Sequence, residues 1–203
     1  AGIRIATETN TIEAGSAVAA LGDVNGDGLD DIIIGARQDH EGSYEAGAAY
    51  VIYGTTQAPQ TLQLADIAAS IGGFKILGET VYDAAGTSVA AAGDVNGDGY
   101  ADILVGAPNH SASVDFADYT GAAYVVFGSA GRTSTLDLQS MAAGTEGFKL
   151  TGEETYQLAG YAVSSAGDFN QDGYGDFVVG AYGGYENGFY KGAAYLVYGT
   201  GNP

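Results

Sequence analysis

Short apolar runs separated by glycine recur three times along the chain, always in the same order. The most strongly apolar runs are residues 32–34, 103–105 and 177–179. Aromatic and β-branched side chains, which favour strands, are concentrated in residues 47–54, 121–128 and 192–199. Small side chains, which suit a crowded innermost position, occupy residues 15–20, 86–91 and 160–165. The pattern predicts three short strands in each copy, with the most apolar strand buried.

A fourth segment of each copy alternates apolar and basic side chains, at residues 2–5, 73–76 and 147–150. This alternation predicts an outer strand with one solvated face. Polar, acidic connectors follow at residues 7–13, 79–84 and 153–158. Between the first two copies, residues 65–70 indicate a helical turn. Four short strands per copy, with glycine between them, predict an all-β chain of four-stranded antiparallel blades, the unit of a β-propeller.

We therefore expect residues 1–203 to form a single β-propeller unit of three repeats, at about 1–72, 73–146 and 147–203. Apolar residues make up 46% of the chain, enough for a substantial core. Because the sequence starts with an outer strand and stops after a third strand, the N-terminal strand is expected to complete a last blade.

Propellers usually close with about four to eight blades, so three blades leave two alternatives. One is a homodimer that closes a six-bladed ring and leaves no free sheet edge. The other is a fragment of a larger, seven-bladed protein. The first residue is Ala rather than Met, which favours a processed or cut chain.

An Asp-rich loop precedes each of the most apolar runs, with the reduced pattern Asp-x-Asn-x-Asp-Gly-x-x-Asp. Side-chain oxygens at positions 1, 3, 5 and 9, with the backbone carbonyl of position 7, form a ligand set for a hard cation. Calcium binds about six to eight oxygens, and glycine after position 5 permits the sharp turn that such a loop needs. The pattern therefore predicts three Ca²⁺ per chain.

The predicted ligands share these positions in the three loops. They are Asp23, Asn25, Asp27, Leu29 (carbonyl) and Asp31; Asp94, Asn96, Asp98, Tyr100 (carbonyl) and Asp102; and Asp168, Asn170, Asp172, Tyr174 (carbonyl) and Asp176.

Two other interpretations fit the loops less well. An EF-hand has a bidentate Glu at position 12 and flanking helices, whereas position 12 here is Ile34, Val105 or Val179 in a strand-like run. A hairpin turn without metal also favours Asp, Asn and Gly. Four such residues at fixed spacing, three times over, favour calcium over the plain turn.

The combined motif resembles the FG-GAP repeat of integrin α-subunit propellers and their bacterial relatives. It runs from the Gly and Val of the small-residue strand, through Gly-Asp-Val-Asn-Gly-Asp-Gly-x-x-Asp, to Gly-Ala-Ala-Tyr-Val. The Phe-Gly that names the repeat is Ala-Gly here, at residues 14–15, 85–86 and 159–160, and the Pro of Gly-Ala-Pro is kept only at Pro108.

This resemblance implies a structural calcium ion in the hairpin between the first two strands of each blade. It also implies ligand binding by loops on the opposite face and an extracellular or cell-surface location, which we expect to be bacterial. The function expected is a calcium-binding adhesion or interaction module. The alternative is a carbohydrate-binding, lectin-like propeller or a carbohydrate lyase.

Charge and composition exclude several classes of partner. The net charge is −19, with 25 acids against six bases, which argues against nucleic acid and anionic membranes. There is no Cys, so neither a disulfide scaffold nor a thiolate nucleophile exists. No apolar stretch approaches a membrane span, and we expect that no signal peptide remains in this sequence.

The candidate ligand face comprises the connectors 37–47, 108–121 and 182–192, which differ in sequence and length. Their polar and aromatic residues are Arg37, Asp39, His40, Glu41, Tyr44, Asn109, His110, Asp115, Asp118, Tyr119, Tyr182, Tyr185, Glu186, Asn187 and Tyr190. Such residues suit a protein loop or a sugar as the ligand. No Asp, Glu, Tyr and Arg cluster breaks the symmetry of the copies, and the two His have no fixed carboxylate partner in sequence, so we expect no enzyme activity.

Overall fold

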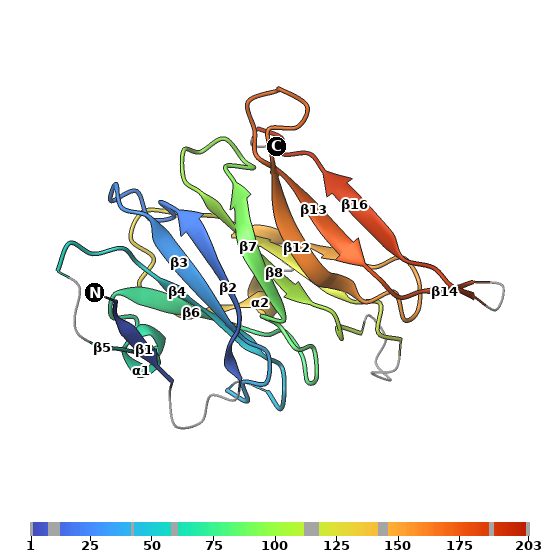
Figure 1. Cartoon of the computed structure of the whole chain (residues 1–203), viewed down its shortest axis with the longest axis horizontal. Coiled ribbons are helices and arrows are strands. Elements are labelled where there is room, and N and C mark those ends of the chain that lie inside the picture. Colours follow the sequence, from blue (N-terminus) through green and yellow to red (C-terminus); the bar gives the residue numbers. More distant parts are fainter. Residues whose placement is uncertain are drawn as a thin grey trace.

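The computed structural model describes residues 2–7, 13–41, 43–57, 61–111, 118–141, 146–186 and 189–201, without the side chains of residues 185–190. Within these ranges the chain consists mostly of strands, which form sheets arranged side by side in a row (Figure 1). The prediction of an all-β chain is confirmed. Part of the first acidic connector, residues 8–12, lies outside the described residues.

Each copy forms one antiparallel sheet. The first contains β2 (Ala14–Gly22), β3 (Asp31–Ala36), β4 (Ala48–Ile52) and β6 (Gly73–Leu77). The second contains β7 (Ser88–Gly93), β8 (Asp102–Ala107), β9 (Ala122–Val126) and β11 (Gly147–Thr151). The third contains β12 (Ala159–Gly167), β13 (Asp176–Ala181) and β16 (Ala193–Val197). The first two sheets thus take their outer strand from the start of the next copy.

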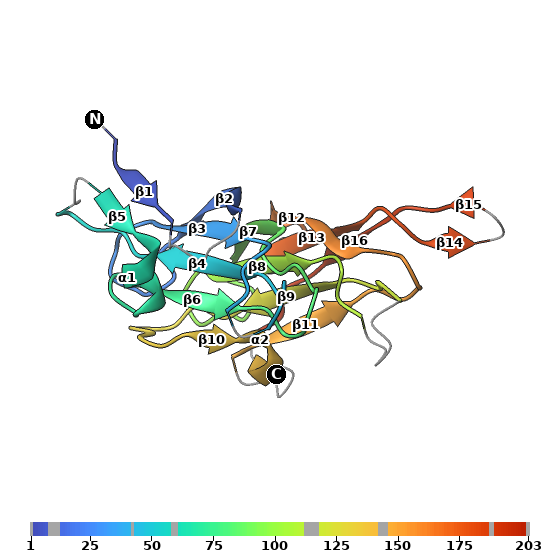
Figure 2. The same ribbon diagram turned by 90° about the horizontal axis from the view of Figure 1, so that it is seen from below.

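Short elements cover the rim and the two ends of the row. The rim holds α1 (Leu64–Ala68), which includes most of the predicted helical turn, and α2 (Leu138–Met141), preceded by β10 (Leu136–Asp137), which pairs in parallel with β6. At one end β1 (Arg4–Ala6) pairs in parallel with β5 (Thr61–Gln63). From the other end a hairpin of β14 (Tyr185–Glu186) and β15 (Phe189–Tyr190) projects (Figure 2). In the described part of the chain, neither helix has the length or apolar character to cross a membrane.

The central strands are apolar without alternation because both of their faces are covered. Ile33 and Val51 face the second sheet and share a hydrophobic cluster with Ile103. The neighbouring side chains Ile34 and Ile52 point the other way and pack with α1. Strands buried on both faces are expected to read as continuous apolar runs, which explains the pattern found in the sequence.

The small-residue strands β2, β7 and β12 lie next to one another along the row, as predicted (Figure 1). Neighbouring sheets approach so closely there that two glycines are required. A Cβ on Gly35 would lie 2.1 Å from the carbonyl oxygen of Gly86, and one on Gly106 would lie 2.0 Å from that of Gly160. No side chain fits against backbone at that distance.

The basic residues of the outer strands lie on tyrosine rings. Lys75 of β6 is only 1% exposed, with its Nζ 2.9 Å from Asp39 Oδ2 and 4.9 Å from the ring centroid of Tyr50. The predicted solvated face is therefore wrong for Lys75, because the acid and the aromatic ring replace water around its ammonium group.

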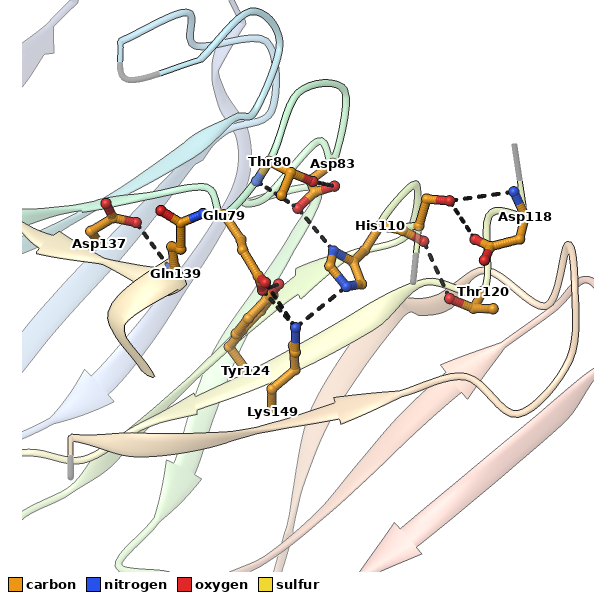
Figure 3. A network of polar contacts seen from close by, with 11 residues as sticks. Glu79, Thr80, Asp83, His110, Asp118, Thr120, Tyr124, Asp137, Gln139 and Lys149 are labelled. Atoms are coloured by element: carbon orange, nitrogen blue, oxygen red, sulfur yellow. Dashed lines mark hydrogen bonds and ion pairs between the residues drawn. The ribbon is translucent and has the colours of Figure 1, made fainter. Parts of the chain in front are cut away.

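The second sheet repeats this arrangement with different acids (Figure 3). Lys149 Nζ lies 2.8 Å from Glu79 Oε2, and the hydroxyl of Tyr124 donates to the same oxygen at 2.6 Å. Burial raises the pKa of Glu79, but the hydrogen bonds from Lys149 and Tyr124 outweigh it and the net pKa is lowered. His110 also joins the network, 3.0 Å from Asp83 and 3.4 Å from Lys149.

The glycine contact between sheets predicts a specific cost of substitution. Gly106→Ala should lower the free energy of unfolding by about 2–3 kcal/mol, because the new methyl group must displace the backbone of the next sheet. Thr133→Ala is the control: Thr133 is exposed, so we expect a change within about 0.5 kcal/mol. Urea titration of both variants tests this, and equal stabilities would contradict the proposed packing constraint.

Candidate functional site

The three Asp-rich loops connect the first and second strands of each sheet, so all three lie at the same edge of the row. The first residue of each loop organises it. The carboxylate of Asp23 accepts the backbone N–H groups of Gly26, Asp27 and Gly28 at 2.6, 3.1 and 2.8 Å. The bond from Gly28 is the main cause of the lowered pKa of Asp23. Asp94 accepts the same three bonds in its own loop, and Asp168 accepts those from Asp172 and Gly173.

Positions 3 and 5 are joined to each other. Asn25 Oδ1 accepts the N–H of Asp27 at 2.9 Å, and Asn25 Nδ2 donates to Asp27 Oδ2 at 3.0 Å. Asp27 Oδ1 accepts the N–H of Leu29 at 2.8 Å. The same bonds recur in the other two loops, so the predicted ligands at positions 1, 3 and 5 are gathered in each.

Position 9 fastens each loop to its sheet. Asp31 is fully buried and accepts the N–H groups of Val24 at 2.9 Å and of Gly54, just beyond β4, at 2.7 Å. The equivalent bonds are Val95 and Gly128 to Asp102, and Phe169 and Gly199 to Asp176. Each oxygen of Asp31 and Asp102 accepts one N–H group and keeps a lone pair. Asp176 Oδ2 accepts from both Phe169 and Asn170, and Oδ1 keeps the lone pair there. This anchoring leaves room for a cation.

Electrostatics at position 9 favours a cation. Burial is the main cause that raises the pKa of Asp102 to about 7, and the charges of Asp98 and Asp94 contribute to this rise. Burial and the neighbouring acids also raise the pKa of Asp31. Among the described residues, none of the ion pairs includes a loop aspartate. A divalent cation would offset this clustered negative charge.

The donor set fits calcium better than a metal held by carboxylates and imidazoles alone. The described residues contain no group of three or more His, Cys, Asp or Glu arranged to hold a metal. The predicted donors of each loop instead include an asparagine amide and the backbone carbonyl of position 7 beside the aspartates, and hard cations accept such mixed oxygen ligands.

The side chains at position 7 have a role that the sequence did not reveal. A Cβ on Gly26 would lie 2.6 Å from the ring of Tyr100, and one on Gly97 would lie 2.5 Å from the ring of Tyr174. Each tyrosine therefore packs on the preceding loop. Backbone bonds run the same way, from the N–H of Ala101 to Asp23 O and from that of Gly175 to Asp94 O, at 3.0 and 2.7 Å. The loops form one connected row.

The opposite face carries groups of aromatic side chains, of which two join neighbouring blades and the third joins β12 to its own connector. Tyr44 stacks on His40 and meets Tyr82 edge-on, with ring centroids 4.8 and 5.5 Å apart. Tyr119 stacks on Tyr156 at 5.8 Å, and Tyr161 meets Tyr182 at 4.4 Å. A pocket of about 200 Å³ lies between the first two groups, lined by Arg37, Gln38, Glu45, Tyr82, Ala84, Asn109 and Tyr119.

Tyr82 and Tyr156 lie at equivalent positions and both have a left-handed backbone, with φ of 69° and 61°. This conformation costs a bulky residue about 1–3 kcal/mol, yet both side chains are about half exposed. These tyrosines are not among the candidate ligand residues predicted from the sequence, although their shared position in two connectors was a signal.

Several predicted ligand-face residues serve the fold instead. Asp39 and His110 are buried in the networks around Lys75 and Lys149. Asp115 and Asn187 lie outside the described residues, as do the side chains of Tyr185, Glu186 and Tyr190. Arg37 and Tyr44 remain on the surface.

Comparison with known protein families finds the FG-GAP repeat at residues 14–52, 85–126 and 159–197. These ranges begin at the first strand of each sheet and end at the third, with the Asp-rich loop between them. The chain is similar to integrin alpha-PS2 of Drosophila melanogaster, with 36% identity over 54% of the chain, and to integrin alpha-2 of Mus musculus, with 35% identity over 49%.

A third relative is phosphatidylinositol-glycan-specific phospholipase D of Bos taurus, which is 37% identical over 53% of the chain. The aligned part spans only 7%, 8% and 12% of these three relatives' own lengths. Because the three repeat matches together cover more than half of the sequence, the protein belongs to the FG-GAP repeat family, and its sheets are β-propeller blades.

Proposed function

We propose that the chain is a calcium-stabilised adhesion or interaction module at the cell surface or outside the cell. The FG-GAP repeats and the similarity to integrin α-subunits support the broader description, an integrin-like interaction module. One observation carries the calcium assignment: each loop gathers two aspartates and an asparagine next to a third, buried aspartate, and that aspartate has no cationic partner among the described residues.

In this proposal one Ca²⁺ per loop is held by the oxygens of positions 1, 3, 5 and 9 and by the carbonyl of position 7. The ion supplies positive charge to the aspartate cluster. If affinity is about 10⁻⁴ M, as in extracellular modules, millimolar calcium stabilises the fold by about 1.4 kcal/mol per site. Because the loops contact one another, stabilising one restrains the next.

A structural role for the ion is favoured over a catalytic one. A catalytic metal requires an open coordination position and a nearby acid or base, and the loops contain no His. One relative is named as a phospholipase, but the aligned region is a small part of that protein. We propose that this chain binds without catalysis.

The ligand surface in this proposal is the aromatic face opposite the calcium loops. A protein ligand is the first candidate, in line with the integrin relatives. A glycan is the second candidate, because exposed tyrosine pairs beside a small polar pocket suit sugar rings.

Calcium binding can be tested with a matched pair of aspartates. Asp98→Asn should reduce the stoichiometry from three to two ions per chain and remove about a third of the calcium-dependent stabilisation. Asp30→Asn is the control, since Asp30 is exposed and lies outside the ligand alternation. Isothermal titration calorimetry, with thermal unfolding in millimolar calcium and in chelator, gives both quantities. Identical unfolding in the two buffers would contradict structural calcium.

On the aromatic face, substitution of an exposed tyrosine should change ligand binding while leaving the stability of the fold nearly unchanged. Tyr82→Gly should change the free energy of unfolding by no more than about 1 kcal/mol, because relief of the left-handed strain offsets the lost ring contact. For a glycan ligand, the same substitution should abolish the wild-type signal on a glycan array. Ile71→Ser, another exposed apolar site, is the control and should leave the signal intact. No wild-type signal would rule out the glycan candidate and leave the protein ligand.

A further inference from the structure

The third blade has an unoccupied outer-strand position and an uncovered face in the described part of the chain. Val51 of β4 and Val125 of β9 are fully buried, whereas the equivalent Leu196 of β16 is 37% exposed. A Cβ on Gly180 would meet nothing closer than 3.4 Å, and that atom belongs to its own blade. The equivalent glycines of the first two blades are pressed against the next blade. Gly180 therefore has free space on the side where the equivalent glycines meet the next blade, as far as the described residues go.

At the other end of the row, β1 lies in the position of an outer strand. The described residues do not provide the other strands of its blade. It pairs in parallel with β5 as β6 pairs with β10. The other edge of β6 pairs with β4, but the described residues provide no strand for the corresponding edge of β1. Ile3, just before β1, is 45% exposed. Figure 2 shows β1 and β16 far apart in one chain.

The third blade and β1, at the two ends of the row, also carry complementary charges. In the first two blades a lysine of the outer strand lies on the tyrosine of the third strand beside an acid, as Lys149 does with Tyr124 and Glu79. In the third blade the hydroxyl of Tyr195 lies 3.4 Å from Glu153, and no cation joins them among the described residues. Arg4 occupies the lysine position of β1, is exposed, and has no ion pair in that same part of the chain.

We propose that β1 of a second copy of this chain completes the third blade. It pairs antiparallel with β16 in the register that β6 makes with β4 and β11 makes with β9. This register places Ile3 of the second copy opposite Leu196, and Arg4 of the second copy on Tyr195 beside Glu153. The exchange is reciprocal, so two chains complete each other's third blades.

The glycine contacts near β1 also support a second copy of the chain as the partner of the third blade. Gly86 and Gly160 are pressed against the preceding blade, where a Cβ would lie 2.2 Å from Ala48 O and 2.0 Å from Ala122 O. Gly15 is their equivalent, also has positive φ, and has nothing within 4 Å. Gly180 and Gly15 of a second copy thus restore the glycine contact that joins the other blades.

The loop row supports the junction as well. Tyr100 and Tyr174 pack on glycines of the preceding loop. At the proposed junction, the first loop of one copy would follow the third loop of the other copy. The position-7 residue of that first loop is Leu29, and position 4 of the third loop is Gln171, where the other loops have glycine. A smaller side chain at one position is therefore matched by a larger one at the other, as expected of two surfaces that meet.

Solution mass and charge reversal test the proposal. In calcium, light scattering should give twice the 20.5 kDa of one chain. Arg4→Glu and Glu153→Arg should each give the monomer mass, and the double variant should regain the dimer. Gly180→Ala should remain folded and be monomeric. Gln139→Glu, an exposed charge change on α2, is the control and should remain dimeric.

A cross-link tests the register directly, because the natural chain has no Cys. The variant with Ile3→Cys and Leu196→Cys should form a covalent dimer on oxidation, while either single variant should not. A wild-type chain that stays monomeric at all concentrations overturns the proposal. A dimer that survives Arg4→Glu and yields no disulfide also overturns it, since the chains would then meet through another surface.

Discussion

Backbone contact between neighbouring blades is the constraint on which the rest of the structure depends. Gly35 against Gly86 and Gly106 against Gly160 bring β3 and β8 within reach of the next inner strand. That separation lets Ile33, Val51 and Ile103 share one cluster, and it brings successive Asp-rich loops into contact. A larger residue at Gly35 or Gly106 would separate the blades and expose part of the apolar central strands to water.

The two edges of the row differ in how similar the three copies are to one another. At the loop edge every copy repeats the same hydrogen bonds, from the position 1 carboxylate to the anchoring of Asp31, Asp102 and Asp176. At the opposite edge the copies differ in length and sequence, and their tyrosines meet across blade boundaries. A uniform, charge-rich edge that fixes the blades thus supports a variable edge suited to recognition.

Local patterns in the sequence predict local structure well here. Fixed spacing of Asp, Asn and Gly identifies the loops, because each residue bonds to neighbours only a few positions away. The burial of Lys75 is not predictable in this way, since its partners are distant in sequence: Asp39 lies in the connector after β3, and Tyr50 lies in β4. The left-handed backbone of Tyr82 is hidden for the same reason: tertiary contacts, including the bond from its N–H to Tyr44 O, hold a conformation that tyrosine rarely adopts.

The sequence repeat and the sheet are offset by one strand, and this has a mechanical consequence. β6 opens the second copy but closes the first sheet, and β11 opens the third copy but closes the second. Each repeat therefore contributes the outer strand of the sheet before it. Pulling one repeat out of the row would remove that outer strand from its neighbour. Under tension the row should resist as a unit and yield in steps that do not correspond to single repeats, unlike stacked repeats that touch only at their surfaces.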